Sequence, residues 1–379
     1  MHEKNQPIIG LQQFFRLQTA QPLVVRLLII LLLFLLLNEQ AQSWQGTISN
    51  TFSGTILNMD TGEPISGANV YLSNTMVGTV SDVAGHFKLT NISPGQHTIV
   101  VRHVGFTSVT RTVSFLTPHQ IETTIHLQPK LITAGTMEVV GKQPKDWQKK
   151  LNLFRKEFLG TSKNSQNCKI LNSEVLELEI DYLTGELSAH TDSVLCVENR
   201  SLGYHIEIVL LEFQVHRNEL IRYSILPKFS LLDPSSDKEE RTWLKNRRET
   251  YLGSLRHFLS ALARDKLEQE GFTLYSGTAN ALRQDFAVYR SPHWIFKIAS
   301  LNDSMLKKIS FDDEIEIHYQ KKYPAILCSA YMQKEFAIID TLGNLFTPFA
   351  FVTRGSWFNE RIADLLPVEY HLGSVLDTK

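Results

Sequence analysis

The sequence has little cysteine and almost no net charge. Only three cysteines occur among 379 residues, and none forms a C-x-x-C pair, so a zinc knuckle or a thioredoxin-type redox site has no support. Lys and Arg number 38 against 39 Asp and Glu, and the net charge of −1 gives no electrostatic basis for binding nucleic acid. Neither H-E-x-x-H nor G-x-x-x-x-G-K-[ST] is present, which removes the usual signatures of a zinc peptidase and a P-loop.

The leading end has the pattern of an export signal. Arg26 is followed by an apolar run, Leu27 to Leu37, which is the length of a signal peptide and short for a membrane span. Ala41-Gln42-Ser43 places small residues where a signal peptidase reads, which predicts cleavage before Trp44. Residues 1–43 are therefore predicted to be a signal peptide of an exported protein. An uncleaved anchor is the alternative, because Leu23-Val24-Val25 extends the apolar stretch.

In an oxidising compartment an odd number of cysteines leaves one unpaired within the monomer. Cys168 and Cys196 are candidates for a disulfide across neighbouring strands, and Cys328 is the third cysteine. The favoured interpretation is that all three are small buried hydrophobic residues.

Short alternating apolar segments, separated by glycine-centred turns, follow one another from Gly54 onward. Val70 and Leu72 are expected to face a core while Asn69 and Tyr71 face water, as in a half-buried strand. Asp60-Thr61-Gly62 predicts a tight turn in which Asp60 supplies the side-chain acceptor. Seven strands are predicted, at Gly54–Leu57, Gly67–Leu72, Gly78–Asp82, Gly85–Leu89, His97–Val104, Thr107–Val113 and Ile121–Leu127.

The order of these motifs resembles the carboxypeptidase regulatory-like domain over residues 50–128. The resemblance implies an all-β, seven-stranded transthyretin-like sandwich, of the kind found in envelope proteins of Gram-negative bacteria. In the carboxypeptidases that gave the family its name, the zinc site lies in a separate domain. The resemblance therefore implies an accessory or interaction module, and it places the exported chain in the periplasm or at the outer membrane, with an inner-membrane anchor as the alternative.

Residues 129–145 are predicted to be a linker, because they lack periodicity and contain Pro129 and Pro144. Residues 146–379 then read as an α+β domain of unknown function. Helices are predicted at Asp146–Leu159, Lys238–Glu270 and Trp357–Leu366. Strands are predicted at Val175–Ile180, Glu186–His190, His205–Phe213, Glu219–Ser224, Phe272–Tyr275, Asp285–Tyr289, Trp294–Ala299, Glu314–Tyr319 and Phe336–Asp340.

Several blocks of this second part resemble a companion domain that follows such sandwiches in envelope proteins. Examples are Phe158-Leu159-Gly160, Tyr251 to Leu259 and Arg361 to Pro367. No biochemical activity is attached to that family, so the resemblance supplies no reaction.

Candidate catalytic and metal-binding groups have simpler structural interpretations. Ser254 and His257 suggest a hydrolase, but a nucleophile elbow needs glycine on both sides of the serine. Gly253-Ser254-Leu255 is instead predicted to lie inside a helix, where Ser254 and His257 face solvent or a neighbouring carbonyl. Asp60, Glu63 and Asp82 are candidate calcium ligands, although carboxylates are also favoured at turns without a metal.

Charged surfaces raise two further candidates. Glu314, Glu316 and His318 alternate along one predicted strand, which is typical of a solvated face. A set of basic residues in 238–270 could read an anionic headgroup or glycan, but interleaved carboxylates favour a charge-balanced helix surface. The basic residues are Arg241, Lys245, Arg247, Arg248, Arg256, Arg264 and Lys266.

The sequence thus assigns no catalytic, cofactor-binding or metal-binding residue and no cofactor. It favours a non-enzymatic binding or assembly module whose partner is an envelope protein or a surface glycan, with peripheral membrane association left open and nucleic acid excluded. The alternative is a hydrolase or carboxypeptidase-related enzyme with its site in residues 151–379. The histidines to search in that case are His205, His216, His257, His293 and His318.

Overall fold

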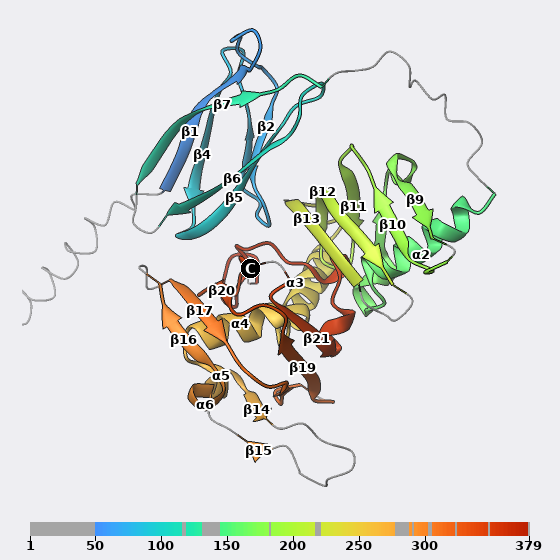
Figure 1. Cartoon of the computed structure of the whole chain (residues 1–379), viewed down its shortest axis with the longest axis vertical. Coiled ribbons are helices and arrows are strands. Elements are labelled where there is room, and N and C mark those ends of the chain that lie inside the picture. The colour runs from blue at the N-terminus through green and yellow to red at the C-terminus, as the bar shows by residue number, and fades with distance from the viewer. Residues whose placement is uncertain are drawn as a thin grey trace, which may run out of the picture. The chain divides into compact units, whose positions relative to one another are not determined.

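A β-sandwich comes first in the folded chain, and a mixed region of sheets and helices follows it (Figure 1). The computed structural model describes residues 50–115, 119–130, 145–181, 183–216, 221–276, 288–289, 292–301, 305–322, 324–347 and 349–377. The predicted signal peptide lies outside the described residues, and so does most of the predicted linker.

The sandwich has the seven predicted strands, in two sheets. One sheet has the order β4-β1-β7, and the other has the order β3-β2-β5-β6. The first and last strands pair in parallel, from Thr51 opposite Gln120 to Asn58 opposite Leu127. The bounds are β1 Asn50–Asn58, β2 Asn69–Leu72, β3 Gly78–Val80, β4 His86–Ile92, β5 Gly95–Arg102, β6 Val109–Phe115 and β7 Gln120–Leu127.

Alternation places most apolar side chains of the sandwich strands in its core. Val70 and Leu72 are buried there, as predicted. The expectation that Tyr71 faces water is wrong, because its side chain is only 3% exposed. The predicted turn after β1 is present, but the oxygen that accepts from the backbone N–H of Asp60, at 2.9 Å, is Oδ1 of Asn58. Asp60 itself is exposed.

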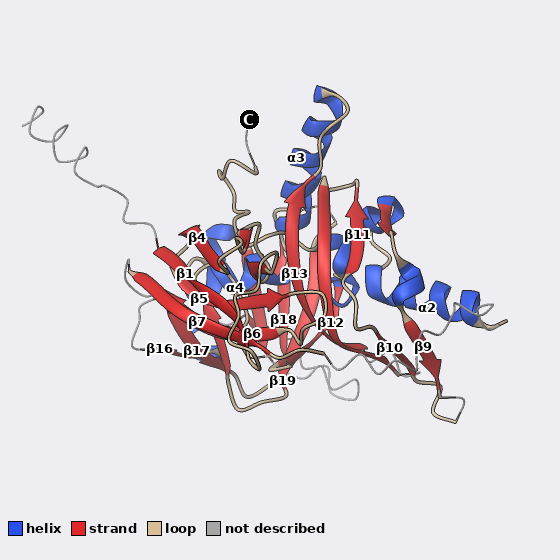
Figure 2. Ribbon diagram, turned by 90° about the horizontal axis from the view of Figure 1, so that it is seen from above, coloured by secondary structure: helices blue, strands red, loops and turns tan. Residues whose placement is uncertain are grey.

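The first part of the mixed region is a six-stranded sheet with α2 (Trp147–Leu159) packed against it. Phe154 and Phe158 of this helix stack on each other and contact Phe213 edge to face, which confirms the predicted amphipathic helix. Figure 2 shows β12 and β13 as long neighbouring strands. The strands are β8 Cys168–Ile170, β9 Glu177–Ile180, β10 Leu187–His190, β11 Leu195–Asn199, β12 Tyr204–Val215 and β13 Ile221–Leu231.

The predicted helix 238–270 is three helices: α3 (Asp237–Tyr251), α4 (Leu255–Ala263) and α5 (Leu267–Glu270). The break falls at Gly253, whose φ of +80° is accessible mainly to glycine. A Cβ at this position would lie 2.4 Å from Cδ1 of Ile326, so the close approach also requires glycine. Ser254 then begins α4 as its N-cap.

Two more sheets complete this region, with orders β15-β14-β18-β19-β21 and β16-β17-β20. Strands β17, β19 and β21 were not predicted. The strand predicted at Trp294–Ala299 is present from Lys297 as β16, and its first two residues belong to the short helix α6. The closing helix 357–366 is instead two 3-10 turns, Ser356–Asn359 and Ile362–Asp364. The bounds are β14 Phe272–Ser276, β15 Val288–Tyr289, α6 Pro292–Ile295, β16 Lys297–Ser300, β17 Leu306–Ser310, β18 Ile315–Tyr319, β19 Ile326–Met332, β20 Ala337–Asp340 and β21 Phe351–Gly355. No helix in the described part of the chain is long and apolar enough to cross a membrane.

Candidate functional site

The loop between β2 and β3, Ser73–Val77, attaches the sandwich to the edge of β13; we call it the docking loop. The backbone N–H of Asn74 donates to the carbonyl of Pro227 at 2.7 Å, and the N–H of Phe229 donates to the carbonyl of Thr75 at 2.9 Å. Thr75 and Lys228 thereby form a parallel β-bridge. The docking loop therefore acts as one more short strand on this sheet.

The other side of the docking loop is held by the segment near the carboxyl end. The N–H of Val368 donates to the carbonyl of Asn74 at 2.7 Å, and the N–H of Met76 donates to Oε1 of Glu369 at 2.9 Å. Burial raises the pKa of the Glu369 carboxyl. The loop is thus bonded through its backbone on both sides.

The contact with β13 explains why Tyr71 is buried. Its hydroxyl donates to the carbonyl of Leu226 at 3.2 Å, and the ammonium of Lys228 lies 5.9 Å from its ring centroid. Leu226 and Lys228 of β13 therefore lie against Tyr71 on the face of β2 that was predicted to be wet, whereas Asn69 on the same face is exposed. Burial raises the pKa of the Tyr71 hydroxyl well above its ordinary value.

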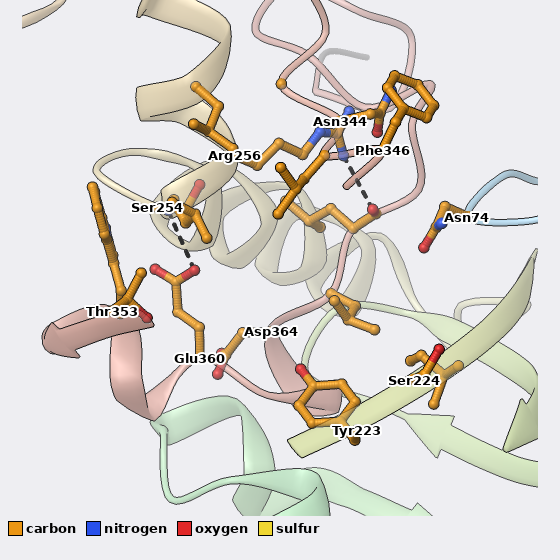
Figure 3. A pocket seen from close by; sticks show the side chains of 18 of the residues that line it. Asn74, Tyr223, Ser224, Ser254, Arg256, Asn344, Phe346, Thr353, Glu360 and Asp364 are labelled. Carbon is orange, nitrogen blue, oxygen red and sulfur yellow. Dashed lines mark hydrogen bonds between the residues drawn. The ribbon is translucent and has the colours of Figure 1, made fainter. Parts of the chain in front are cut away.

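A cavity of about 660 Å³ opens beside this contact; we call it the junction cavity (Figure 3). One wall is β13, from Ile221 to Leu226, and another is the start of β21, from Phe351 to Thr353. Residues 96–98 of the sandwich, the start of α4 and the segment 343–346 close the rest. Figure 3 shows Tyr223 of β13 on the opposite side of the cavity from Ser254.

Two carboxyl groups border the junction cavity. Oε2 of Glu360 accepts from the N–H of Leu255 at 3.3 Å, and burial, assisted by the nearby Asp364 charge, raises the pKa of Glu360 to about 8. Oδ1 of Asp364 accepts from Ser162 and Asn164, each at 2.8 Å. Burial raises the pKa of Asp364 as well. Glu360 is therefore mostly protonated at neutral pH and acts there as a polar, uncharged group.

Arg256, in the first turn of α4, has a structural role. Its guanidinium donates to the carbonyls of Leu366, Pro367, Val368 and Tyr370 at 2.7 to 3.1 Å, and Nε reaches Leu342 at 3.3 Å. Burial lowers its pKa. The side chain fastens the segment that in turn holds the docking loop.

The basic residues that were predicted to form one surface in 238–270 lie in different environments. Arg247 is buried and donates from Nε to the carbonyl of Leu202 at 2.8 Å, so it is not part of a charged surface. Arg248 pairs with Asp377 at 3.0 Å, while Arg241 and Lys245 are exposed. Neither an anion-reading patch nor a uniformly solvated helix face describes the whole set.

Ser254 and His257 do not form a nucleophile and base pair. The serine hydroxyl accepts from the backbone N–H of His257, at 3.1 Å, as an N-cap. The His257 ring is 1% exposed, with Nδ1 accepting from the N–H of Gly253 and Nε2 lying 2.6 Å from Glu270. The expectation that this histidine faces solvent or a neighbouring carbonyl is wrong, because its ring is buried at the start of α4 between the Gly253 N–H and Glu270.

The remaining predicted candidates stay apart. Asp82 Oδ1 accepts from the N–H groups of Ala84 and His86, which is turn chemistry. His216 pairs with Glu186, and His318 pairs with Glu316 on β18. The side chain of His293 lies outside the described residues. Among the described residues, no three His, Cys, Asp or Glu side chains gather as metal ligands.

The three cysteines are free. Cys168 and Cys328 are buried, as the favoured interpretation predicted, and Cys196 is half-buried. Cys168 lies opposite Asn199, three positions along β11 from Cys196, so the two thiols are not cross-strand partners.

Sequence reasoning missed the junction cavity, because its walls come from segments far apart in the chain. Arg256 was counted only as a surface cation, and Glu360 was not singled out. The available signals were two blocks: Tyr251 to Leu259 contains Arg256, and Arg361 to Pro367 contains Asp364 and two of the carbonyls that Arg256 binds.

The fold defines the first part of the chain as a β-sandwich, and a family comparison agrees. A model described as CarboxypepD_reg-like domain matches residues 52–139, so the predicted resemblance is confirmed for the sandwich. A search of curated proteins finds no match.

Similar solved structures cover different shares of the chain. A type II cohesin–X-dockerin complex from Acetivibrio cellulolyticus is similar over 21% of this chain and 58% of that one, at 23% identity and a TM-score of 0.19. A second mutant of that complex is similar over 56% of its own length, at 22% identity and a TM-score of 0.17. The major pilin subunit of Bacillus cereus is similar over 81% of this chain and 96% of that one, at 9% identity and a TM-score of 0.17.

Proposed function

We propose that this chain is an exported cell-envelope protein that works without catalysis, as a binding or assembly module. The observation that carries the proposal is the junction cavity, which is built where a regulatory-like sandwich docks onto the following region. Arg256 and Glu360 bond to backbone groups there, and Ser254 caps α4 instead of pairing with His257 as a nucleophile with its base. Such a site suits recognition of a partner.

For the partner and the cellular location, we propose those that the sequence favours. The partner is an envelope protein or a surface glycan, and peripheral association with a membrane stays part of the proposal. Export rests on the apolar run that ends at Leu37 and the predicted cleavage site before Trp44. The mature chain is placed in the periplasm or at the outer membrane.

Purification from envelope membranes, followed by mass spectrometry of what co-purifies, tests the proposal. A partner that is retained by the wild-type chain in stoichiometric amount supports it. Recovery of the chain alone, from both detergent extracts and the periplasmic fraction, counts against it.

The enzymatic alternative has its own test. A metallocarboxypeptidase holds zinc with about three protein ligands and needs a carboxylate base. Elemental analysis and assays against carboxyl-terminal peptide substrates are expected to show neither stoichiometric zinc nor turnover. Near-equimolar zinc, together with cleavage that a chelator abolishes, would replace the binding-module proposal with a peptidase.

A further inference from the structure

The edge of β13 is used only in part by the sandwich. The docking loop covers residues 227–229, whereas residues 221–226 continue along the wall of the junction cavity. β13 pairs with β12 on one side, from Tyr204 opposite Leu231 to Val215 opposite Ile221. Its other side is the outer edge of the six-stranded sheet.

The hydrogen bonds to the docking loop show which backbone groups point outward. Pro227 offers its carbonyl and Phe229 its N–H to that loop, so these two residues face away from β12. Alternate residues of an antiparallel strand direct both backbone groups to the same edge. The register shift between Leu210 and Glu212 adds a residue to β12 and none to β13, so the alternation along β13 continues and Tyr223 and Ile225 also direct their N–H and C=O groups outward.

Pro227 supports this assignment independently. Proline has no N–H and is tolerated in a strand only where the missing donor would face an edge. The outward groups of Tyr223 and Ile225 make no backbone hydrogen bond to another segment of the described chain. Unpaired edge groups of this kind are a template for an added strand.

The opposite wall of the cavity also ends in an edge strand. Among the described strands β21 pairs with β19 alone, and its residues Phe351, Val352 and Thr353 line the cavity. The segment 221–225 offers about five residues of edge, or ~17 Å of extended chain. A side chain projecting from an added strand would meet apolar and aromatic lining such as Phe346 and Trp357.

We propose that the junction cavity binds an extended peptide segment of a partner protein, which adds as a strand to the edge of β13 at Tyr223 and Ile225. This rests on the proposed function, and it identifies the partner as a polypeptide bound through its backbone. The argument for this occupant is continuity: the same edge, two residues further on, already accepts the docking loop in the same way. A glycan lacks the alternating donors and acceptors that such an edge pairs.

The test uses random seven-residue peptides displayed on phage, selected against the full mature chain. A selected peptide is then synthesised with N-methyl groups on one alternate set of residues or on the other. Methylation of the set that faces β13 is expected to weaken binding by about tenfold or more, because it removes edge hydrogen bonds, while the other set changes binding by less than about threefold. Equal weakening by both sets, or selection of no peptide, would overturn the inference.

A variant of the chain provides the complementary measurement. Ile225→Pro removes an outward N–H, as Pro227 does naturally, and also the side chain that packs against the core, and it is expected to weaken peptide binding by about tenfold. Ser224→Pro, which removes a bond to β12, reports the cost of damage to the sheet itself. Unchanged peptide binding by folded Ile225→Pro would contradict the inference. If that variant does not fold, the methylated peptides on the wild-type chain decide.

Failure of this inference is separable from failure of the proposed function. The selected peptide is added as a competitor during purification from envelope membranes. A partner that is captured but not displaced by the peptide means that the β13 edge is not its site, while the binding-module function stands. Capture of no partner at all contradicts the proposed function itself.

Discussion

Arg256 donates a 2.7 Å hydrogen bond to the carbonyl of Val368, and Val368 in turn donates one of 2.7 Å to the docking loop at Asn74. A side chain of α4 thus supports, through one intervening residue, the contact between the sandwich and the rest of the chain.

The substitution Arg256→Ala is expected to destabilise the protein. Four carbonyls in residues 366–370 would lose their charged donor, and we expect the free energy of unfolding to fall by about 3 kcal/mol. Urea unfolding followed by tryptophan fluorescence measures the change. The matched control is Arg241→Ala on the exposed face of α3, which is expected to stay within about 0.5 kcal/mol of wild type. Equal effects of the two variants would contradict the supporting role of Arg256.

Tyr71 is expected to contribute to docking by its hydroxyl and by its ring. Tyr71→Phe removes the bond to the Leu226 carbonyl and should cost about 1 kcal/mol, whereas Tyr71→Ala also loses buried ring area and should cost about 3 kcal/mol or more. Val80→Ala on the neighbouring strand, where the side chain is 55% exposed, is the control. A Tyr71→Ala variant as stable as this control would show that β13 does not bury the ring.

The raised pKa of Glu360 predicts how the stability of the protein depends on pH. Its pKa is raised from 4.5 to about 8, so the folded state keeps a proton that the unfolded state loses. Its contribution to stability is complete below pH 4.5 and is lost as the pH rises toward 8. Glu360→Gln cannot ionise, so its stability relative to wild type is expected to increase between pH 5 and pH 9.

Urea titrations of Glu360→Gln and wild type at pH 5, 7 and 9 measure this difference. Glu335→Gln, at an exposed position, serves as the control and is expected to show a nearly constant difference from wild type. A constant difference for Glu360→Gln too would mean that this carboxyl titrates normally.

Export predicts a defined amino terminus. Sequencing of the chain recovered from the envelope is expected to begin at Trp44 or within a few residues of it. An intact Met1 in the membrane fraction would establish the uncleaved anchor instead.

Limited proteolysis tests the predicted linker. The first cut is expected within residues 129–145, where the sequence lacks periodicity. The two fragments should nevertheless elute together under native conditions, because the docking loop and Tyr71 bind the edge of β13. A first cut inside the sandwich, or immediate separation of the fragments, would contradict this expectation.

The sandwich could be predicted from the sequence because its signals are local. Period-two alternation around Val70 and turns at Gly62 or Gly105 each act over a few residues. The break of the long helix at Gly253 was missed because the apolar stripe continues across it. The break lies at Gly253, whose φ of +80° is not helical, and the side chain of Ile326 that packs close to it is remote in sequence.

The junction cavity could not be predicted for the same reason. The pattern of β2 alone predicts that Tyr71 faces water, and only the contact with β13 buries it. The pKa of Glu360 is raised by burial, which the local sequence does not reveal. Charge patterning cannot distinguish Arg256, which binds the backbone of residues 366–370, from the exposed Arg241. Contacts between distant segments decide each of these cases.

The hydrogen bond from Met76 to Glu369 also has a consequence for the order of folding. It joins residues 293 positions apart, so it cannot form during synthesis until nearly the whole chain has emerged. The sandwich, whose strands all lie before residue 128, can fold long before that moment. Closing such a long loop carries a large entropic cost and makes late, slow assembly the natural course. The unpaired edge of β13 and the open docking loop would then be exposed together in a nearly finished chain, which is the stage at which exchange of the sandwich between two copies competes with correct closure.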